Sequence, residues 1–127
     1  MSNAFVEHVN MTVADPLATA ELFVALFGWK IRWQGDAIYD GFSVHVGSEN
    51  SYIALYTRGY IVQPTDDSYT QVRGLNHIGI VVDDIKEIES RVRARGLQPH
   101  SHADYEPGQR FYFKNNDELE VEVVSYS

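Results

Sequence analysis

The sequence predicts an α+β fold built from two copies of one unit, each with the order strand, helix and three strands. The first observation is a repeat: residues 76–84 follow the pattern of residues 7–15, and His77 takes the place of His8 at an offset of 69 residues. A helix pattern follows each copy, and three strand patterns follow each helix. Agreement at several places along the chain indicates an internal repeat.

The first unit, predicted over residues 5–56, opens with a strand over residues 5–13. Apolar and polar residues alternate along most of this strand. Because successive side chains of a strand point to opposite faces, His8, Asn10 and Thr12 are predicted to share one face. The apolar side chains then form the core on the other face.

The sequence also bounds the helix that follows. Asp15 is the predicted N-cap, Pro16 occupies the first turn, and Gly28 ends the helix. Three strands are predicted after it, with Gly41 as a bulge in the second of them. These strands cover residues 29–34, 38–46 and 51–56.

A linker is predicted over residues 57–72, which have no clear period and contain glycine, proline and aspartate. The second unit then covers residues 73–126, so that one domain spans residues 5–126. A polar loop holding Pro107 is predicted over residues 102–108. The other predicted elements are a strand over residues 74–82, a helix over 85–95, and strands over 97–101, 109–114 and 118–125.

Composition excludes several classes of function. The 127 residues, 44% of them hydrophobic, suffice for one compact domain, and no apolar run approaches the ~20 residues of a membrane-spanning helix. A net charge of −8 disfavours nucleic acid and anionic membranes as partners. The chain has no cysteine, which excludes thiolate metal sites and fits a cytoplasmic protein.

The candidate metal ligands are two histidines and one glutamate. Glu122 lies between two valines on the last predicted strand, so its carboxylate needs a partner. Together with His8 and His77 it makes a two-histidine, one-carboxylate set, which leaves coordination positions open for a substrate. A lone strand histidine is more often a packing residue, and Arg110 is an alternative partner for Glu122. The matched histidines of the repeat favour the metal site.

The sequence resembles the vicinal oxygen chelate superfamily, which includes glyoxalase I, bleomycin-resistance binders, extradiol dioxygenases and fosfomycin-resistance proteins. The resemblance rests on residues 7–15, 27–29, 76–84 and 111–123. It implies two tandem βαβββ modules that form a curved mixed sheet around a metal-binding cleft. It also implies a small-molecule substrate, a homodimer and one divalent metal ion, either Fe, Mn, Zn, Ni or Co.

By the same resemblance, His8, His77 and Glu122 match three of the family's four ligand positions. The fourth matches Ala54, which has no ligand atom. Three-ligand sites are typical of extradiol dioxygenases and fosfomycin-resistance enzymes, so four-ligand isomerases are less favoured.

Further cleft residues are predicted around this set. Alternation on the neighbouring strand predicts that Arg110 and Tyr112 both face the metal. Arg110 is then a candidate for substrate binding, and Tyr112 is a candidate for catalysis. His100 and His102, predicted at a loop over the cleft, are candidate acid or base groups. The predicted substrate-binding residues are Arg110, Asn10, Thr12, Tyr52 and Tyr56.

Three functions remain open from the sequence. The first is a metal-dependent enzyme acting on a small molecule with adjacent oxygens, whether lyase or isomerase, dioxygenase or transferase. The second is a metal-free binder of drugs or aromatic molecules, of the bleomycin-resistance type. The third is a structural protein with a vestigial cleft. The tyrosines and tryptophans suit the second function, but it leaves the His-His-Glu set unexplained.

Overall fold

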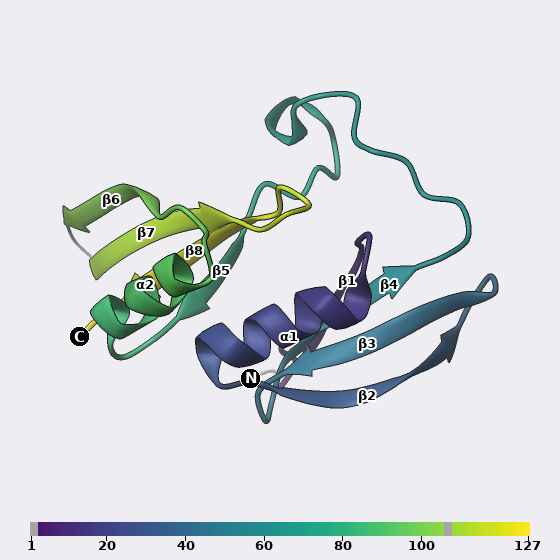
Figure 1. Cartoon of the computed structure of the whole chain (residues 1–127), viewed down its shortest axis with the longest axis horizontal. Helices are drawn as coiled ribbons and strands as arrows, with labels where there is room; N and C mark the ends of the chain where they lie inside the picture. The colour runs from purple at the N-terminus through teal and green to yellow at the C-terminus, as the bar shows by residue number, and fades with distance from the viewer. Residues whose placement is uncertain (1–2, 106–107) are drawn as a thin grey trace. The chain divides into compact units, whose positions relative to one another are not determined.

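The computed structural model describes residues 3–105 and 108–127 and contains two compact units, which divide between Val62 and Gln63. Each unit has one four-stranded mixed sheet with one helix on one of its faces (Figure 1). The α+β class and the order βαβββ in each unit are therefore confirmed.

The first unit has its sheet in the order β1-β4-β3-β2. β1 runs parallel to β4, and the other neighbours are antiparallel. Parallel pairing of β1 requires a crossover, which the helix supplies. The elements are β1 (His8–Thr12), α1 (Pro16–Phe27), β2 (Lys30–Ala37), β3 (Gly41–Gly47) and β4 (Tyr52–Thr57).

Both ends of α1 lie where the sequence predicts them. Asp15 Oδ1 accepts a hydrogen bond from the backbone N–H of Ala18 at 3.1 Å, which satisfies one orphan donor of the first turn. Gly28 has a φ of 70° and donates its N–H to the carbonyl of Val24 at 3.0 Å. This left-handed conformation costs glycine little because it has no Cβ.

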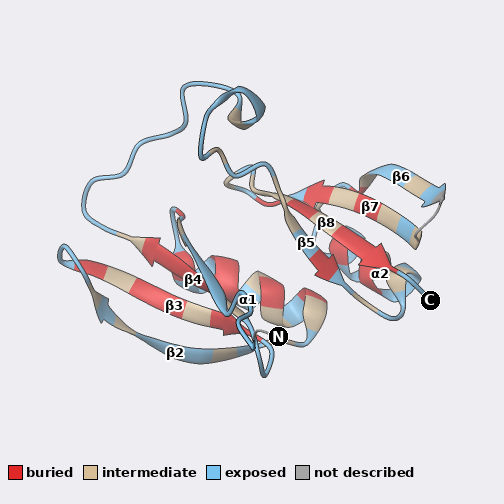
Figure 2. Cartoon of the chain, turned by 180° about the vertical axis from the view of Figure 1, so that it is seen from behind, coloured by how far each residue is buried: buried red, intermediate tan, exposed pale blue. Residues whose placement is uncertain are grey.

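The core of the first unit lies between α1 and the sheet. Phe23 and Leu26 of α1 are buried together with Val44 and Val46 of β3 and Leu55 of β4. Burial of each such side chain contributes about 1.5–3 kcal/mol to the stability of the folded state. Figure 2 shows these buried segments in red, whereas β2 is mostly pale blue. Strand alternation leaves the opposite face of the sheet for polar side chains.

The second unit repeats this plan with the order β5-β8-β7-β6. β5 runs parallel to β8, and its core includes Val92, Phe111, Phe113, Val121 and Val123. A short 3₁₀ helix precedes the sheet at Ser68–Thr70. The other elements are β5 (Ile78–Val81), α2 (Ile85–Ala94), β6 (His100–Tyr105), β7 (Gly108–Lys114) and β8 (Glu120–Ser125).

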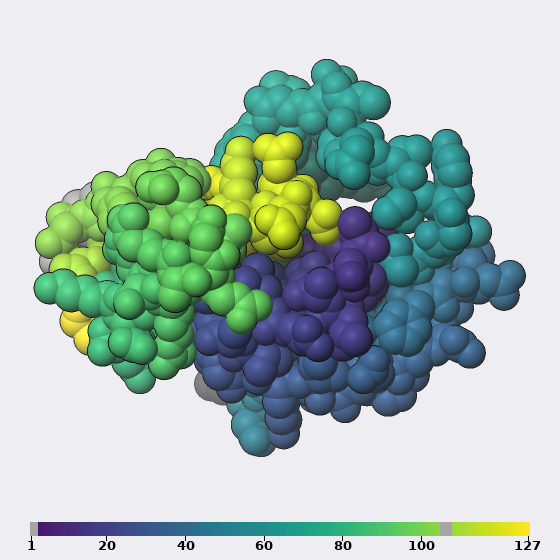
Figure 3. Space-filling view, in the orientation of Figure 1, coloured from purple at the N-terminus to yellow at the C-terminus, as the bar shows by residue number. Residues whose placement is uncertain are grey.

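The outer side of α2 is charged. Arg91 pairs with Glu87 at 3.2 Å, and Arg93 pairs with Glu89 at 2.9 Å, each one helical turn apart. The green atoms of α2 form part of the outer surface of the second unit in Figure 3. Among the described residues no helix is long and apolar enough to cross a membrane.

Several predicted local features differ from the structure. Residues 38–40, predicted to begin a strand, form the turn between β2 and β3. Residues 100–105 form the strand β6, so the part of the predicted 102–108 loop that the structure describes is mostly strand, while Pro107 lies outside the described residues. The predicted bulge at Gly41 is also wrong, because β2 and β3 shift register between Ile31 and Trp33 instead. A bulge depends on how two strands pair, which local composition does not reveal.

Gly41 has a packing role that can be tested. A Cβ at this position would overlap the ring of Tyr56, whose hydroxyl donates to the carbonyl of Ile38 at 2.7 Å. We expect Gly41→Ala to lower the free energy of unfolding by about 1–3 kcal/mol, measured by urea denaturation. Gly59→Ala is the control, since nothing lies within 4 Å of its Cβ position. Equal stability of the two variants would contradict this packing role.

Candidate functional site

The polar face of the second sheet centres on Glu122 of β8. Its register partners are Gly79 of β5 and Tyr112 of β7, and Tyr112 in turn lies opposite His100 of β6. Because register partners share a face, these positions form one row across the sheet, on the side away from α2. Gly79 adds no side chain, and even a Cβ at this position would lie 3.9 Å from Oε1 of Glu122.

Both oxygens of the Glu122 carboxylate have partners. Oε1 lies 3.2 Å from Nε2 of His77, and Oε2 accepts a hydrogen bond from Nη1 of Arg110 at 2.8 Å. The side chain is only 12% exposed, so these contacts replace the water that burial removes. The structure therefore brings together three of the predicted site residues: His77, Arg110 and Glu122.

Two tyrosines surround the imidazole of His77. Tyr112 meets it edge-on, with ring centres 5.6 Å apart. The hydroxyl of Tyr69 lies 3.5 Å from Nδ1, on the side away from Glu122. Sequence reasoning missed Tyr69, because it comes from a segment without periodicity and no local pattern points to it.

His100 lies on this same face of the second sheet. Its ring stacks on Tyr112 with centres 6.1 Å apart, and its Nε2 lies 3.5 Å from Oε2 of Glu120. Its Nδ1 lies 2.9 Å from Oγ of Ser101, a closer contact that orients the imidazole. His100 is the first residue of β6 and falls within the strand predicted over residues 97–101.

His102 lies on the opposite face, toward α2. It stacks on Phe111 with ring centres 5.8 Å apart, and its Nε2 lies 3.1 Å from Oε2 of Glu89. The reason is a register shift between His100 and Ala103, with Ser101 at a φ of 56°. The imidazole of His102 therefore lies on the helix side of the sheet, and not on the face where the sequence predicted it.

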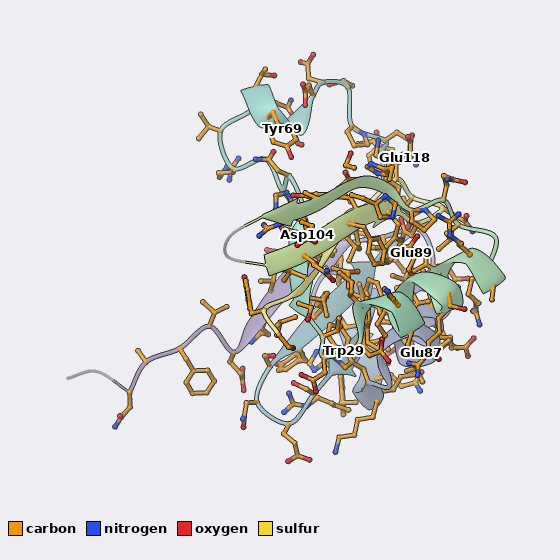
Figure 4. All side chains as sticks on the ribbon, turned by 90° about the vertical axis from the view of Figure 1, so that its left-hand side faces the viewer. Trp29, Tyr69, Glu87, Glu89, Asp104 and Glu118 are labelled. Atoms are coloured by element: carbon orange, nitrogen blue, oxygen red, sulfur yellow. The ribbon has the colours of Figure 1, made fainter. Side chains whose placement is uncertain are left out.

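The surroundings of His102 form a cavity of about 330 Å³ between α2, β6 and β7. Figure 4 labels Glu89 on α2 and Asp104 on β6, two acidic residues that line it. Burial works against ionisation of Glu89, but hydrogen bonds with Arg93 and His102 outweigh it and hold the pKa of Glu89 below its usual range. These groups stabilise one another on the helix side of the sheet.

The first sheet carries a row of rings on the face away from α1. His8 stacks on Tyr52 with centres 4.9 Å apart, and Tyr52 stacks on His45 at 4.6 Å. Trp33 follows at 5.0 Å from His45. Sequence reasoning named His8 and Tyr52 but missed His45 and Trp33. Alternation in β3 carries the signal for His45, which shares its face with Ser43 and lies opposite the core valines.

The remaining predicted substrate residues differ in how accessible they are. Asn10 and Thr12 are exposed and lie opposite Ala54 and Tyr56 in the sheet. Tyr56 is 8% exposed, and its hydroxyl donates to the carbonyl of Ile38. The hydroxyl of Tyr56 thus has a structural role, in contrast to the predicted substrate contact.

The residues present fit two adjacent ligands of a divalent metal. The His77 imidazole and the Glu122 carboxylate are adjacent on one open face, and nitrogen with carboxylate oxygen suits Mn, Fe or Zn. Within residues 3–105 and 108–127 no three His, Asp or Glu side chains gather closely enough to hold a metal ion. His8 belongs to the first unit, where its Nδ1 lies 2.8 Å from Oε1 of Glu7. The three-ligand set remains a prediction.

Comparison with known proteins identifies the family. The model of the Glyoxalase/Bleomycin resistance protein/Dioxygenase superfamily matches residues 6–123, and the chain belongs to this superfamily. A search of curated proteins gave no match.

Solved structures share the fold at low sequence identity. The glyoxylase/bleomycin resistance protein/dioxygenase domain from Frankia sp. EAN1pec has a TM-score of 0.80 at 20% identity, covering 98% of each chain. Glyoxalase I from Leishmania major has a TM-score of 0.77 at 17% identity, covering 98% of this chain and 88% of that one. The fosfomycin resistance protein FosX from Listeria monocytogenes has a TM-score of 0.71 at 15% identity, covering 98% and 94%.

The charge state of His45 is a testable property of the first sheet. Burial lowers the pKa of His45, the nearby His8 and Arg32 lower it further, and Glu7 opposes them. The folded state therefore binds fewer protons than the unfolded chain between the two pKa values, so this contribution to stability falls as pH drops through that window.

We expect NMR titration of the imidazole C–H signals to give His45 a pKa below that of the unfolded chain. Arg32→Gln removes a repelling charge and should raise this pKa. Arg58→Gln is the control, because that guanidinium lies over Tyr39 and is absent from the charges acting on His45. A His45 pKa at or above the unfolded value would contradict the effect of burial.

Proposed function

We propose that the protein is a metal-dependent enzyme acting on a small molecule with adjacent oxygens. The single observation that carries the proposal is the contact between His77 and Glu122 on the open face of the second sheet, 3.2 Å apart. The superfamily match supports it, since relatives by fold include glyoxalase I and FosX. One FosX structure is described as complexed with Mn(II) and sulfate.

His77 and Glu122, with His8 from the first unit, would hold one divalent ion, either Fe, Mn, Zn, Ni or Co. A metal held there would supply Lewis-acid stabilisation of charge that develops on the substrate oxygens. Ala54 at the fourth family position leaves a three-ligand set, as in extradiol-dioxygenase and fosfomycin-resistance sites. The proposal favours these chemistries over four-ligand isomerisation.

The chain's own residues have distinct roles in this proposal. Arg110 holds the Glu122 carboxylate in a fixed orientation through a 2.8 Å hydrogen bond. His100, beside Tyr112 on this face, exchanges a proton with the substrate. Tyr112, between His77 and His100, donates its hydroxyl to a substrate oxygen. Asn10, Thr12 and Tyr52 contact the substrate from the first unit.

A homodimer in the cytoplasm completes the proposal. β1 and β5 each pair with a single strand among the described residues, so each sheet offers an edge for association. The lack of cysteine suits a reducing compartment.

A second candidate is a metal-free binder of planar aromatic molecules. The ion pair between Arg110 and Glu122 gives this carboxylate a cationic partner from the chain itself, and this contact favours the second candidate. The row of rings on the first sheet also suits an aromatic ligand. In this case a ligand would bind equally well before and after metal removal.

The proposed metal site predicts the metal content of defined variants. We expect His8→Ala, His77→Ala and Glu122→Gln each to weaken metal binding more than about 100-fold, because each removes a direct ligand and loss of even an outer-shell partner costs 10–100-fold. Calorimetric titration of chelator-treated protein with Mn²⁺ and Zn²⁺ measures this.

His102→Ala is the matched control, because that imidazole contacts Glu89 on the helix side. It should bind metal as the unaltered protein does. Unchanged affinity in both His8→Ala and His77→Ala would contradict the proposal and leave the metal-free binder.

A further inference from the structure

The face of the first sheet away from α1 carries an unbroken row of four rings, one from each strand. His8 of β1, Tyr52 of β4, His45 of β3 and Trp33 of β2 follow one another with centres 4.9, 4.6 and 5.0 Å apart. We name these four residues the ring ladder. It crosses the whole sheet, and neither core packing nor the proposed metal ligands account for His45 and Trp33.

A bulge in β2 builds the outer end of the ladder. The register passes from Ile31 opposite Val46 to Trp33 opposite His45, so Arg32 is the additional residue. An extra residue breaks the alternation locally, which lets Arg32 and Trp33 reach the same face. The guanidinium carbon of Arg32 lies 4.6 Å from the centre of the Tyr52 ring.

Gly35 makes room for the indole of Trp33. A Cβ at Gly35 would lie 2.8 Å from Cζ2 of Trp33, too close for two carbons. The indole therefore lies over the backbone of its own strand. Trp33 nevertheless remains 49% exposed, so this end of the ladder is open to a ligand.

The rings of the ladder are stacked at one end and tilted at the other. The planes of His8 and Tyr52 are 16° apart and those of Tyr52 and His45 are 26° apart, whereas the indole of Trp33 is tilted by 52° from His45. Aromatic rings attract one another in offset-stacked and edge-to-face arrangements, so the exposed indole beside His45 offers contacts to a planar ring.

The charge on this face favours a ligand that carries an anionic group. Salt bridges hold Arg91, Arg93 and Arg110, whereas Arg32 has no carboxylate within ion-pair distance among the described residues. Glu7, the acidic group at the other end of the ladder, is engaged by His8. Arg32 is exposed and lies beside the ladder, where its guanidinium can meet a ligand.

We propose that the ring ladder and Arg32 bind a planar aromatic ring that carries a carboxylate. The ring packs against Trp33, His45 and Tyr52, and the guanidinium of Arg32 takes the carboxylate as a two-point hydrogen-bonded pair. An aromatic carboxylate is thereby named as the substrate class of the proposed function. The inference rests on that function only because it places the substrate on the face of the first sheet away from α1.

The test is a titration of chelator-treated protein with 2-naphthoate, followed by calorimetry and by ¹H–¹⁵N NMR shifts. Two matched probes separate the contributions: 2-naphthylmethanol has the ring without the charge, and acetate has the charge without the ring. We expect saturable binding of 2-naphthoate with shifts on β2, β3 and β4. We expect binding at least about tenfold weaker for 2-naphthylmethanol, and no saturation by acetate.

Variants then assign the binding to the ladder. Arg32→Gln should weaken 2-naphthoate roughly tenfold or more and leave 2-naphthylmethanol unchanged, because only the charged hydrogen bonds are lost. Trp33→Leu should weaken both probes. Arg58→Gln, a cation over Tyr39 outside the ladder, should alter neither.

Equal affinity of Arg32→Gln and Arg58→Gln for 2-naphthoate would overturn the proposal, as would absence of saturation in folded protein. Shifts centred on the cavity beside α2 would also overturn it. Because this titration needs no metal, its failure leaves the proposed metal site to be judged by metal binding alone.

Discussion

Strand alternation is the constraint on which the rest of the structure depends. In both sheets the apolar side chains of every second position pack beneath a helix, as Val44 and Val46 do beneath α1. This burial fixes the register, because a shift of one residue would expose the whole apolar set. The other face is thereby assigned to polar and aromatic residues, among them His8 and Glu122. The faces of the candidate site residues on regular strand segments follow from this constraint.

Much of this arrangement could be read from the sequence. The alternation around His8 and around Glu122 predicted which face of the sheet each lies on, and Asp15 and Gly28 bounded the first helix. Arg110 and Tyr112 could be placed beside Glu122 because β7 and β8 are neighbouring strands joined by a short turn. Each of these inferences needed only a regular period and a local connection.

The residues whose positions differ from the prediction lie where the strand alternation is interrupted or absent. The bulges at Arg32 and Ser101 change the face of later side chains, and they arise from pairing between strands. His102 was therefore expected in the cleft and lies beside Glu89 instead. Tyr69 belongs to a segment without periodicity, so its approach to His77 depends on tertiary folding alone. In this chain the two bulges and the irregular segment account for the differences at the site.

The central claim is the proposal that His8, His77 and Glu122 are ligands of one divalent metal. Paramagnetic broadening of ¹H–¹⁵N NMR signals by substoichiometric Mn²⁺ tests it most directly, because the broadening falls off steeply with distance from the ion. The account predicts that signals of residues around these three ligands broaden first. Broadening confined to one unit, or centred on the carboxylates of α2, would contradict it.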